Sequence, residues 1–207
     1  MFSLKQKKKR VTTKGDDAFK EKVDIIFERY LMRNPYFRDV WALFPPNAGY
    51  PGAFPRGLIN QVKKKWWGTN RLWLFSGSFK DNSGTTFDIK SELNPKVCGN
   101  CEVLPFKNES FDFVFADPPY SKEESKELYN LPYVNIIKTL NEMIRVCKPG
   151  GHILFLHRLV PTVFPKLRLS SHCSLKGVVG VYMIAGMSNM RALTIFQKSY
   201  NLDAWNP

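Results

Sequence analysis

FDFVFADPPY, residues 111–120, starts as a mostly apolar run and ends in a carboxylate, two prolines and a tyrosine. The apolar run predicts a buried strand that delivers Asp117 to its carboxyl end, which is where open α/β sheets bind ligands. Pro118 and Pro119 hold the backbone extended and remove two N–H donors, so carbonyl acceptors are left beside the carboxylate. We therefore expect this strand end to be the chemical centre of an α/β protein.

The four residues DPPY suit a planar group that bears an –NH₂. The Asp117 carboxylate and the Pro118 carbonyl can accept its two protons, and the Tyr120 ring can stack on its plane. Holding both N–H bonds in this way draws the nitrogen from planar toward tetrahedral and frees its lone pair for an electrophile. The structural alternative is a plain proline turn that closes a strand. The aromatic residue directly after the prolines favours the functional interpretation.

The sequence around this motif has the pattern of apolar runs expected of an α/β fold. Short apolar runs separated by turns predict buried strands at residues 72–76, 85–89, 111–116 and 152–157. Apolar residues at helical spacing predict a helix over 133–147, so a strand, a helix and a strand follow one another and imply a right-handed parallel crossover. Residues 178–185 and 191–198 look like an antiparallel pair. The sum is a Rossmann-like, mostly parallel sheet with a C-terminal antiparallel hairpin and N-terminal helices.

Two connections in this scheme are unusually short. Residues 77–84 separate the first two predicted strands, and residues 90–96 precede the next one. A parallel crossover normally needs about a dozen residues, most often including a helix. We therefore expect two crossover helices to be absent and the N-terminal helices, or a second subunit such as a homodimer partner, to cover that face of the sheet.

The N-terminal third differs from the rest in composition. Residues 1–14 hold six basic residues and no acidic one, which predicts a disordered basic arm. Residues 15–70 are expected to form an N-terminal helical segment, with helices near 17–32 and 55–65, and residues 71–207 the core domain. The segment 44–57 between the two helices is rich in proline and glycine and predicts a loop.

The charge of the chain favours a polyanionic partner. There are 31 Lys and Arg against 18 Asp and Glu, a net charge of +13, and Lys63-Lys64-Lys65 precede two tryptophans. Such an excess suits phosphate contact, although a basic, solvated surface is the plain alternative. No apolar run is long enough to span a bilayer and no secretory signal is visible, so we expect a soluble, intracellular, cytoplasmic protein. Cys98 and Cys101 have zinc-ligand spacing but lack a second close pair, so reduced thiols and no metal are expected.

At this point the sequence resembles a known family. DPPY is similar to the catalytic motif of class I S-adenosylmethionine-dependent amino-methyltransferases, which act on adenine N6 or guanine N2. Four segments resemble parts of that family in the expected order: YPGAFPRGLI at 50–59, LWLFSGSF at 72–79, EVLPFKNESFDFVFADPPY at 102–120 and RVCKPGGHILFLH at 145–157. The resemblance covers roughly residues 50–198.

The resemblance implies S-adenosyl-L-methionine as cofactor and assigns roles to residues. Asp117, Pro118, Pro119 and Tyr120 would be catalytic. The cofactor would be bound by the first strand and its glycine turn, by an acid at the end of the second strand, by the adenine loop and by a segment over its methionine end: Phe75, Ser76, Gly77 and Ser78; Asp88 and Ile89; Asn100 and Glu102; Phe54 and Pro55. Gly77 stands alone where the family has two or three glycines, and Asn100 stands where many relatives carry Asp.

The sequence therefore predicts an S-adenosylmethionine-dependent methyltransferase that acts on an exocyclic amino group of a nucleic-acid base. Adenine N6 in DNA is the first expectation, because of the segment YPGAFP. RNA is the alternative substrate, at guanine N2 or adenine N6. A catalytically silent, nucleic-acid-binding subunit of the same fold is the alternative from a different class; the thin glycine turn favours it and the intact DPPY opposes it.

Overall fold

The computed structural model describes residues 37–47, 53–161, 172–184 and 189–200. The chain divides into two units, Met1–Tyr36 and Phe37–Pro207, and all described residues belong to the second. The predicted basic arm and the helix predicted near residues 17–32 lie outside the described residues.

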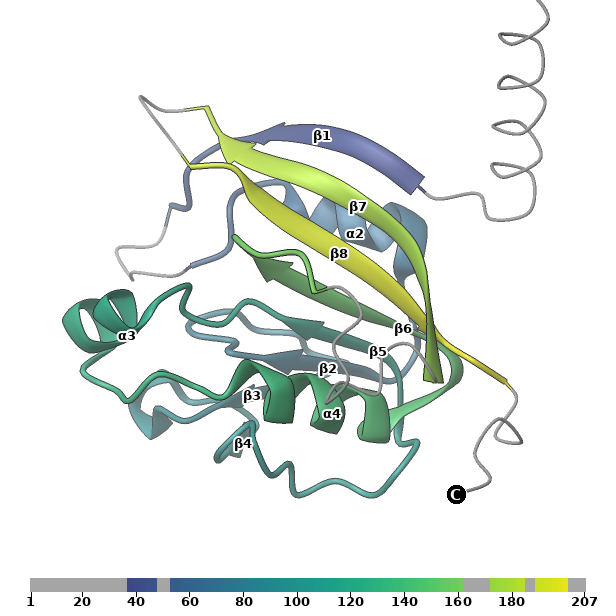
Figure 1. The fold of residues 1–207 in the computed structure, drawn as a ribbon. Coiled ribbons are helices and arrows are strands. Elements are labelled where there is room, and N and C mark those ends of the chain that lie inside the picture. The colour runs from purple at the N-terminus through teal and green to yellow at the C-terminus, as the bar shows by residue number, and fades with distance from the viewer. Residues whose placement is uncertain (1–36, 48–52, 162–171, 185–188, 201–207) are drawn as a thin grey trace, which may run out of the picture. The chain divides into compact units, whose positions relative to one another are not determined.

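One mixed sheet of eight strands organises the second unit (Figure 1). Its spatial order is β1-β7-β8-β6-β5-β2-β3-β4. All neighbouring pairs are parallel except those made by β8, which runs against both β6 and β7. The bounds are Phe37–Leu43 for β1, Arg71–Leu74 for β2, Thr85–Asp88 for β3, Val97–Cys98 for β4, Phe111–Ala116 for β5, Cys147–His157 for β6, Cys173–Met183 for β7 and Arg191–Lys198 for β8. The predicted α/β fold with a mostly parallel sheet and a C-terminal antiparallel hairpin is confirmed.

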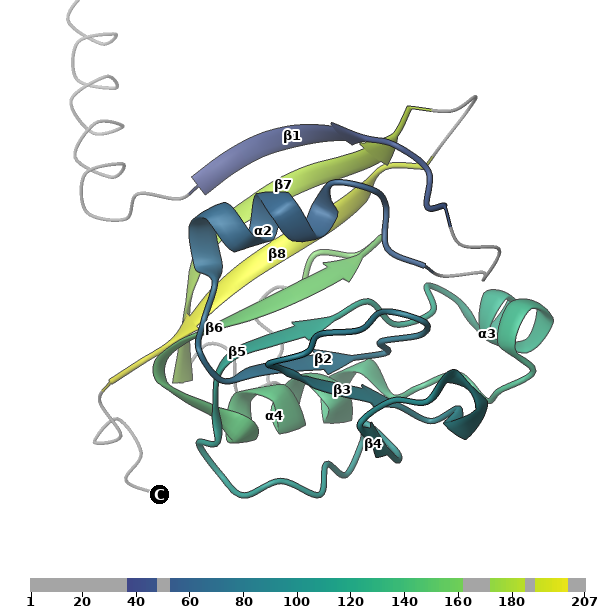
Figure 2. The same cartoon turned by 180° about the vertical axis from the view of Figure 1, so that it is seen from behind.

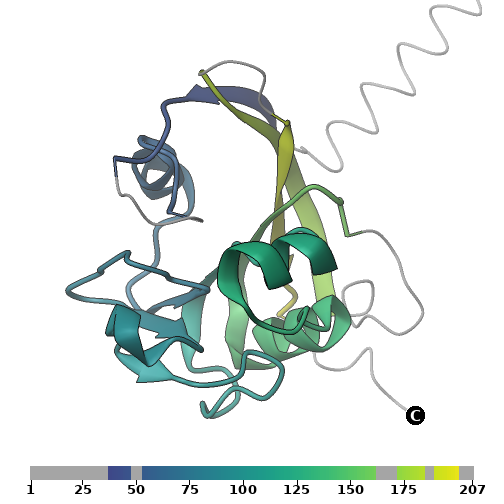
Figure 3. The same ribbon diagram turned by 90° about the vertical axis from the view of Figure 1, so that its left-hand side faces the viewer.

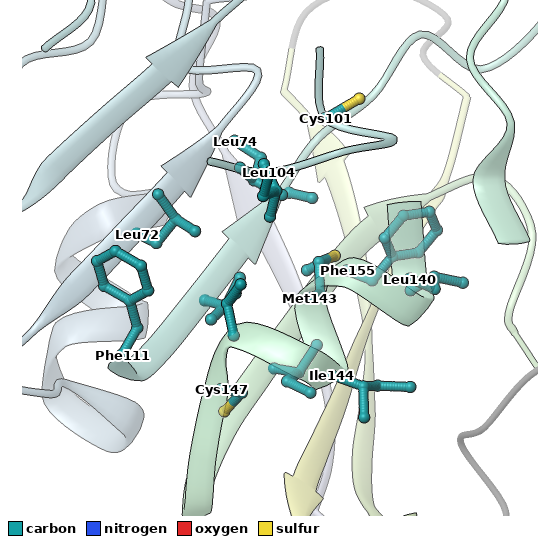
Figure 4. Packing of buried hydrophobic residues seen from close by; sticks show 14 of the residues in the cluster. Leu72, Leu74, Cys101, Leu104, Phe111, Leu140, Met143, Ile144, Cys147 and Phe155 are labelled. Atoms are coloured by element: carbon teal, nitrogen blue, oxygen red, sulfur yellow. The ribbon is translucent and has the colours of Figure 1, made fainter. Parts of the chain in front are cut away.

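Helices lie on both faces of this sheet. Helix α4 (Ile136–Val146) covers one face, and α2 (Leu58–Trp66) covers the other, as the opposite views in Figures 1 and 2 show. Alternate residues of each strand enter separate cores, because successive strand side chains point to opposite faces. The core under α4 contains Leu72, Leu74 and Val114 (Figure 4), and the core under α2 contains Trp73 and Phe115.

The two crossover helices are absent between β2, β3 and β4, as expected. The described segments 75–84 and 89–96 contain one 3₁₀ turn, Ser91–Leu93, and no α-helix. On the face opposite α4, helix α2 and a group of aromatic rings lie over the sheet, and Trp41 and Leu43 of the edge strand β1 join the same core. The rings of Phe54 and Phe79 lie 4.9–6.2 Å from that of Trp73 or from each other. Helix α2, which falls within the segment expected to be helical, lies over this face, and the helix predicted near residues 17–32 lies outside the described residues.

A buried ion pair fixes the short β2–β3 connection. Arg71, the first residue of β2, donates from Nε and Nη2 to the two carboxylate oxygens of Asp81 at 2.8 and 3.0 Å. The indole N–H of Trp73 donates to Asp81 Oδ2 at 2.9 Å. Burial in water-poor surroundings makes such a pair costly unless every donor is used, and here the Arg71 guanidinium also donates to Gly68, Thr69 and Ser83. The network anchors a loop that has no helix to hold it.

Two elements were not predicted. Strand β1 pairs in parallel with β7 at the edge of the sheet, within the segment that was expected to be helical. Helix α3 (Lys122–Tyr129) follows the DPPY motif directly. The helix predicted over residues 133–147 spans Ile136–Val146, and residues 148–151 form part of the first half of β6.

Candidate active site

The carboxyl ends of the parallel strands meet at one edge of the sheet, the edge that faces the viewer in Figure 3. A cavity opens there between the ends of β2, β3 and β5 and the chain that follows β5. Its lining combines three carboxylates with aromatic and aliphatic side chains. The sequence-predicted residues in the lining are Phe75, Gly77, Asp88, Ile89, Asn100, Glu102, Asp117 and Pro119. The fold thus brings together residues spread over more than forty positions of the chain.

Asp117 follows the last residue of β5 and is half-buried. Its Oδ1 accepts a 2.7 Å hydrogen bond from the Tyr120 hydroxyl, and this hydroxyl accepts a 3.1 Å bond from Arg191 Nη1. Burial raises the pKa of Asp117 to about 6, while Arg191 and the Tyr120 hydrogen bond lower it and Glu124 raises it further. The carboxylate is therefore ionised near neutral pH but close to its titration.

The Tyr120 ring is enclosed on several sides. The guanidinium carbon of Arg158 lies 5.1 Å from the ring centroid, and the His157 ring meets it edge-on at 5.4 Å. Its pKa is raised well above the ordinary value, mainly by burial and next by Asp117. In this structure Tyr120 is a hydrogen-bond donor to Asp117 rather than a side of the cavity. Pro118 is buried and likewise does not line it.

Helix α3 fixes the backbone of the motif. The Ser121 side chain accepts the N–H of Glu124 at 3.1 Å, and the Glu124 carboxylate accepts the N–H of Tyr120 at 2.7 Å. This reciprocal pair resembles a capping box, whose sequence signature Ser-x-x-Glu stands at residues 121–124. That signature could have predicted α3. The chain after it, residues 125–134, adds Ser125, Tyr129, Leu131, Pro132, Tyr133 and Val134 to the cavity wall.

The turn after β2 has the geometry of a ligand-binding turn. Phe75 has φ +56° and Gly77 has φ +52°, both in the left-handed region. For Phe75 this conformation stores strain, which concentrates at functional sites. The N–H of Gly77 donates to Asp88 Oδ2 at 2.8 Å, so the turn and the end of β3 are tied together. Ser76 between them is buried and is not among the residues that line the cavity.

Three polar residues stand at the end of β3 or just after β4, and they differ in how many hydrogen-bond acceptors remain unused. Asp88 accepts one backbone N–H at each oxygen, from Gly77 and Lys90, so lone pairs are left on both. Asn100 accepts the N–H of Glu102 within its own turn. The Glu102 carboxylate accepts the N–H of Asn135, the first residue before α4, and lies 3.5 Å from the Lys138 ammonium. Asp88 is therefore the acid best placed to accept ribose hydroxyls.

Phe54, Pro55 and Ser78 lie elsewhere. They line a second hollow with Phe79 and Arg56 on the α2 side of the β2–β3 turn, and the Phe54 ring packs on Trp73, Phe79 and Phe115. The structure does not bring them into the cavity that holds Asp88 and Asp117. The reason is physical: the missing crossover helices leave an apolar face that these rings fill.

The cavity fits the cofactor that the sequence implies. Phe75, Phe87 and Ile89 offer apolar surface for an adenine ring, and Asp88 offers acceptors for ribose hydroxyls. A Cβ at Gly99 would lie 3.0 Å from the Phe87 ring, so the ring would have to shift to admit a side chain there. The three carboxylates of the lining, Asp88, Glu102 and Asp117, give this cavity acidic character, which suits a positively charged sulfonium.

The basic residues of α2 lie away from this cavity. Lys63, Lys64 and Lys65 are exposed in the last turn of α2, where cations also suit the helix dipole. The helix ends just ahead of β2, and Asn70 bonds to Asp112 at the start of β5. These lysines are therefore near the amino ends of the strands, whereas Asp117 is at the carboxyl end, roughly 16 Å further at about 3.3 Å per strand residue.

Cys98, Cys101, Cys147 and Cys173 are free thiols, and burial raises the pKa of Cys101 to about 11. Among the described residues no group of three or more His, Cys, Asp or Glu is arranged to hold a metal ion. In the same part of the chain, none of the helices has the length and apolarity to cross a membrane.

Comparison with known proteins agrees with this geometry. Residues 81–155, from the β2–β3 connection to β6, match the family model described as a methyltransferase domain. The match implies S-adenosylmethionine as cofactor and supports an S-adenosylmethionine-dependent methyltransferase. The α/β fold, in which the last strand of the chain, β8, runs against both its neighbours, agrees with the class I methyltransferase type expected from the sequence. No curated protein matches the sequence.

Similar solved structures include an S-adenosylmethionine-dependent methyltransferase from Methanosarcina mazei, with 14% identity, a TM-score of 0.46 and coverage of 68% of this chain and 98% of that one. TrmN from Thermus thermophilus is similar with 15% identity, a TM-score of 0.47 and coverage of 71% of this chain. The similar part spans 50% of TrmN.

Proposed function

We propose that the protein is an S-adenosylmethionine-dependent methyltransferase that acts on an exocyclic amino group of a nucleic-acid base, with adenine N6 in DNA as the first choice. The observation that supports this most is the place of Asp117. A half-buried carboxylate stands at the end of β5, in the same cavity as the Gly77 turn and Asp88. The net charge of +13 favours a polyanion as the partner.

The cofactor and the residues of the DPPY motif have separate roles in this proposal. When bound, S-adenosylmethionine supplies an electrophilic methyl group. Asp117 accepts an N–H of the substrate amine, which orients the nitrogen lone pair and offsets the positive charge that develops there. The sequence also predicts the Pro118 carbonyl as a second acceptor, but Pro118 is buried and is not among the residues that line the cavity. The methylated amine would have to lose a proton, and Asp117, which lines the cavity, would be the base to accept it.

A duplex substrate adds one requirement. A base inside the helix cannot reach a carboxylate at the bottom of a cavity, so the target must be flipped out or be single-stranded. Segment 125–134, which contributes two tyrosines to the cavity wall, offers aromatic surface for such a base. RNA with an unpaired guanine or adenine meets the same requirement and is the second candidate.

The test is transfer of a labelled methyl group from S-adenosylmethionine to separate pools of DNA and RNA, followed by nucleoside analysis. The proposal expects label in N6-methyladenine of DNA. Label in N2-methylguanine or N6-methyladenine of RNA would correct the substrate and keep the chemistry. Cofactor binding without label in either pool would favour the silent subunit.

A further inference from the structure

Arg191 is the first residue of β8, and its place depends on the direction of that strand. Because β8 is antiparallel to β6, its first residue lies beside the last residues of β6; the register pairs Ala192 with His157. A strand that ran parallel would have placed Arg191 at the far edge of the sheet. The reversal therefore brings a cation from the C-terminal hairpin to the end of β5.

The cation is linked to the carboxylate through one side chain. Arg191 Nη1 donates to the Tyr120 hydroxyl at 3.1 Å, and the hydroxyl donates to Asp117 Oδ1 at 2.7 Å. The phenol occupies Oδ1 on one side, and the described residues provide no donor to Oδ2. We infer that Arg191 is a positioning residue of the transfer: through the Tyr120 hydroxyl it holds the Asp117 carboxylate in orientation and in its ionised form.

The charges around Asp117 make this role specific. The groups that face Asp117 and Tyr120 come from every neighbouring element: Glu124 from α3, His157 and Arg158 from the end of β6, Arg191 from β8, and Asp88, Lys90 and Glu102 from the other walls of the cavity. Arg191 lowers the pKa of Asp117, whereas burial and Glu124 raise it. Arg191 therefore opposes the effect of burial, which favours the protonated form of Asp117.

The surroundings of the Arg191 guanidinium also support a role in the site. Its Nη2 is buried without an acceptor among the described residues. Its pKa is raised by Tyr120 and Asp117, although burial alone would lower it. A buried, incompletely bonded guanidinium is costly for the fold, which indicates that its position serves the site rather than stability.

The inference rests on the proposed function for its meaning, so its test has a readout apart from methyl transfer. The protein is labelled with ¹³C at aspartate carboxyl carbons, and the Asp117 signal is identified by its loss in Asp117→Asn. Its titration is followed in the wild type, Arg191→Gln, Arg191→Lys and Tyr120→Phe. We expect the midpoint to rise by roughly one pH unit or more in Arg191→Gln, the usual effect of losing a neighbouring opposite charge, and to rise less in Arg191→Lys.

Arg158→Gln is the matched control, because Arg158 lies over the Tyr120 ring without a bond to its hydroxyl. A similar rise in Arg158→Gln, or an unchanged midpoint in Arg191→Gln, would overturn the inference. If Arg191→Gln does not fold, Tyr120→Phe decides: an unchanged Asp117 midpoint overturns the link through the hydroxyl. A shifted midpoint in a protein that transfers no methyl group would keep this inference and reject the proposed function.

Discussion

The Tyr120 hydroxyl donates a 2.7 Å hydrogen bond to Oδ1 of Asp117, three residues before it in the same motif. From the sequence, the tyrosine was expected to offer its ring to the substrate and the aspartate its oxygens. In the structure the two side chains bind each other, and the ring lies between Arg158 and His157. One oxygen of Asp117 is thus bound within the protein, and the described residues provide no donor to the other.

The titration of Asp117 predicts a pH profile. The carboxylate is the form that accepts an N–H, and burial raises its pKa to about 6. The rate of methyl transfer should therefore fall about tenfold per pH unit below pH 6 and level off above it. Single-turnover rates from pH 5 to 8 measure this. A rate without an acid limb in that range would contradict the role of Asp117.

The raised pKa of Asp117 also affects the free energy of unfolding, and this effect decreases as the pH rises. Because the folded state raises the pKa of Asp117 above its ordinary value of 3.8, it favours the protonated form. This contribution to the free energy of unfolding is present below pH 4 and lost as the pH rises through about 6. Asp117→Asn should thus gain stability relative to the wild type on going from pH 4 to pH 7. Urea unfolding at both pH values tests this sign.

Asp88 should contribute to cofactor affinity. Asp88→Ala removes acceptors for two hydroxyl groups and releases the N–H of Gly77, so S-adenosylmethionine binding should weaken by about 1.5–3 kcal/mol. Calorimetry with the intact protein measures it. Glu92→Ala, an exposed acid four residues away, is the control and should bind normally. Equal affinities in the two variants would mean that the cofactor is held elsewhere.

The buried pair of Arg71 and Asp81 should matter for stability rather than chemistry. Asp81→Ala leaves the guanidinium without its partner, which typically costs about 3–5 kcal/mol of unfolding free energy. The Arg71 guanidinium holds the pKa of Asp81 well below its ordinary 3.8, so the difference from the wild type should shrink as the pH falls below about 4. The exposed Asp39→Ala is the control. A loss no larger than that of the control would remove the pair as the anchor of the β2–β3 loop.

Two basic segments predict salt-dependent binding of nucleic acid. Deleting residues 1–14, or replacing Lys63, Lys64 and Lys65 by glutamine, should weaken binding to all sequences alike, because phosphate contacts do not read bases. The log-log salt slope should fall in magnitude by about 0.7–0.9 per lost contact. Because the three lysines lie far from Asp117, the rate at saturating substrate should not change. Unaltered slopes in both variants would leave the charge without a role in binding.

Much of the fold could be predicted because its signals are local. The apolar runs that became β5 and β8 are bounded by turn residues, and the apolar stripe of α4 has helical spacing. Strand β1 escaped prediction because its partner β7 lies about 140 residues away, and its sequence FRDVWAL mixes charged with apolar residues. Helix α3 escaped because Ser125 is its buried residue, so no apolar stripe marks it.

In the candidate site, as in the fold, the residues with local sequence signals could be predicted and those placed by long-range pairing could not. Asp88 and Asp117 could be predicted because each follows its own strand, and parallel strands end at one edge. Arg191 could not, because its relation to Tyr120, 71 residues earlier in the chain, depends on the pairing of β8 with β6, which was not predicted. Phe54 was placed by resemblance over the cofactor. Its actual neighbours Trp73 and Phe115 follow from the missing crossover helices, whose space the aromatic rings occupy.

The most direct test of the central claim compares the wild type with Asp117→Asn in two measurements on the same samples: calorimetric binding of S-adenosylmethionine and single-turnover transfer of its labelled methyl group to nucleic acid. The account predicts that binding stays within a few-fold, because the adenosine-side residues are untouched. It predicts that transfer slows by about 10²–10³ or more, since a preorganised acceptor is lost at the reacting nitrogen. Transfer at a near-normal rate in Asp117→Asn would contradict the account.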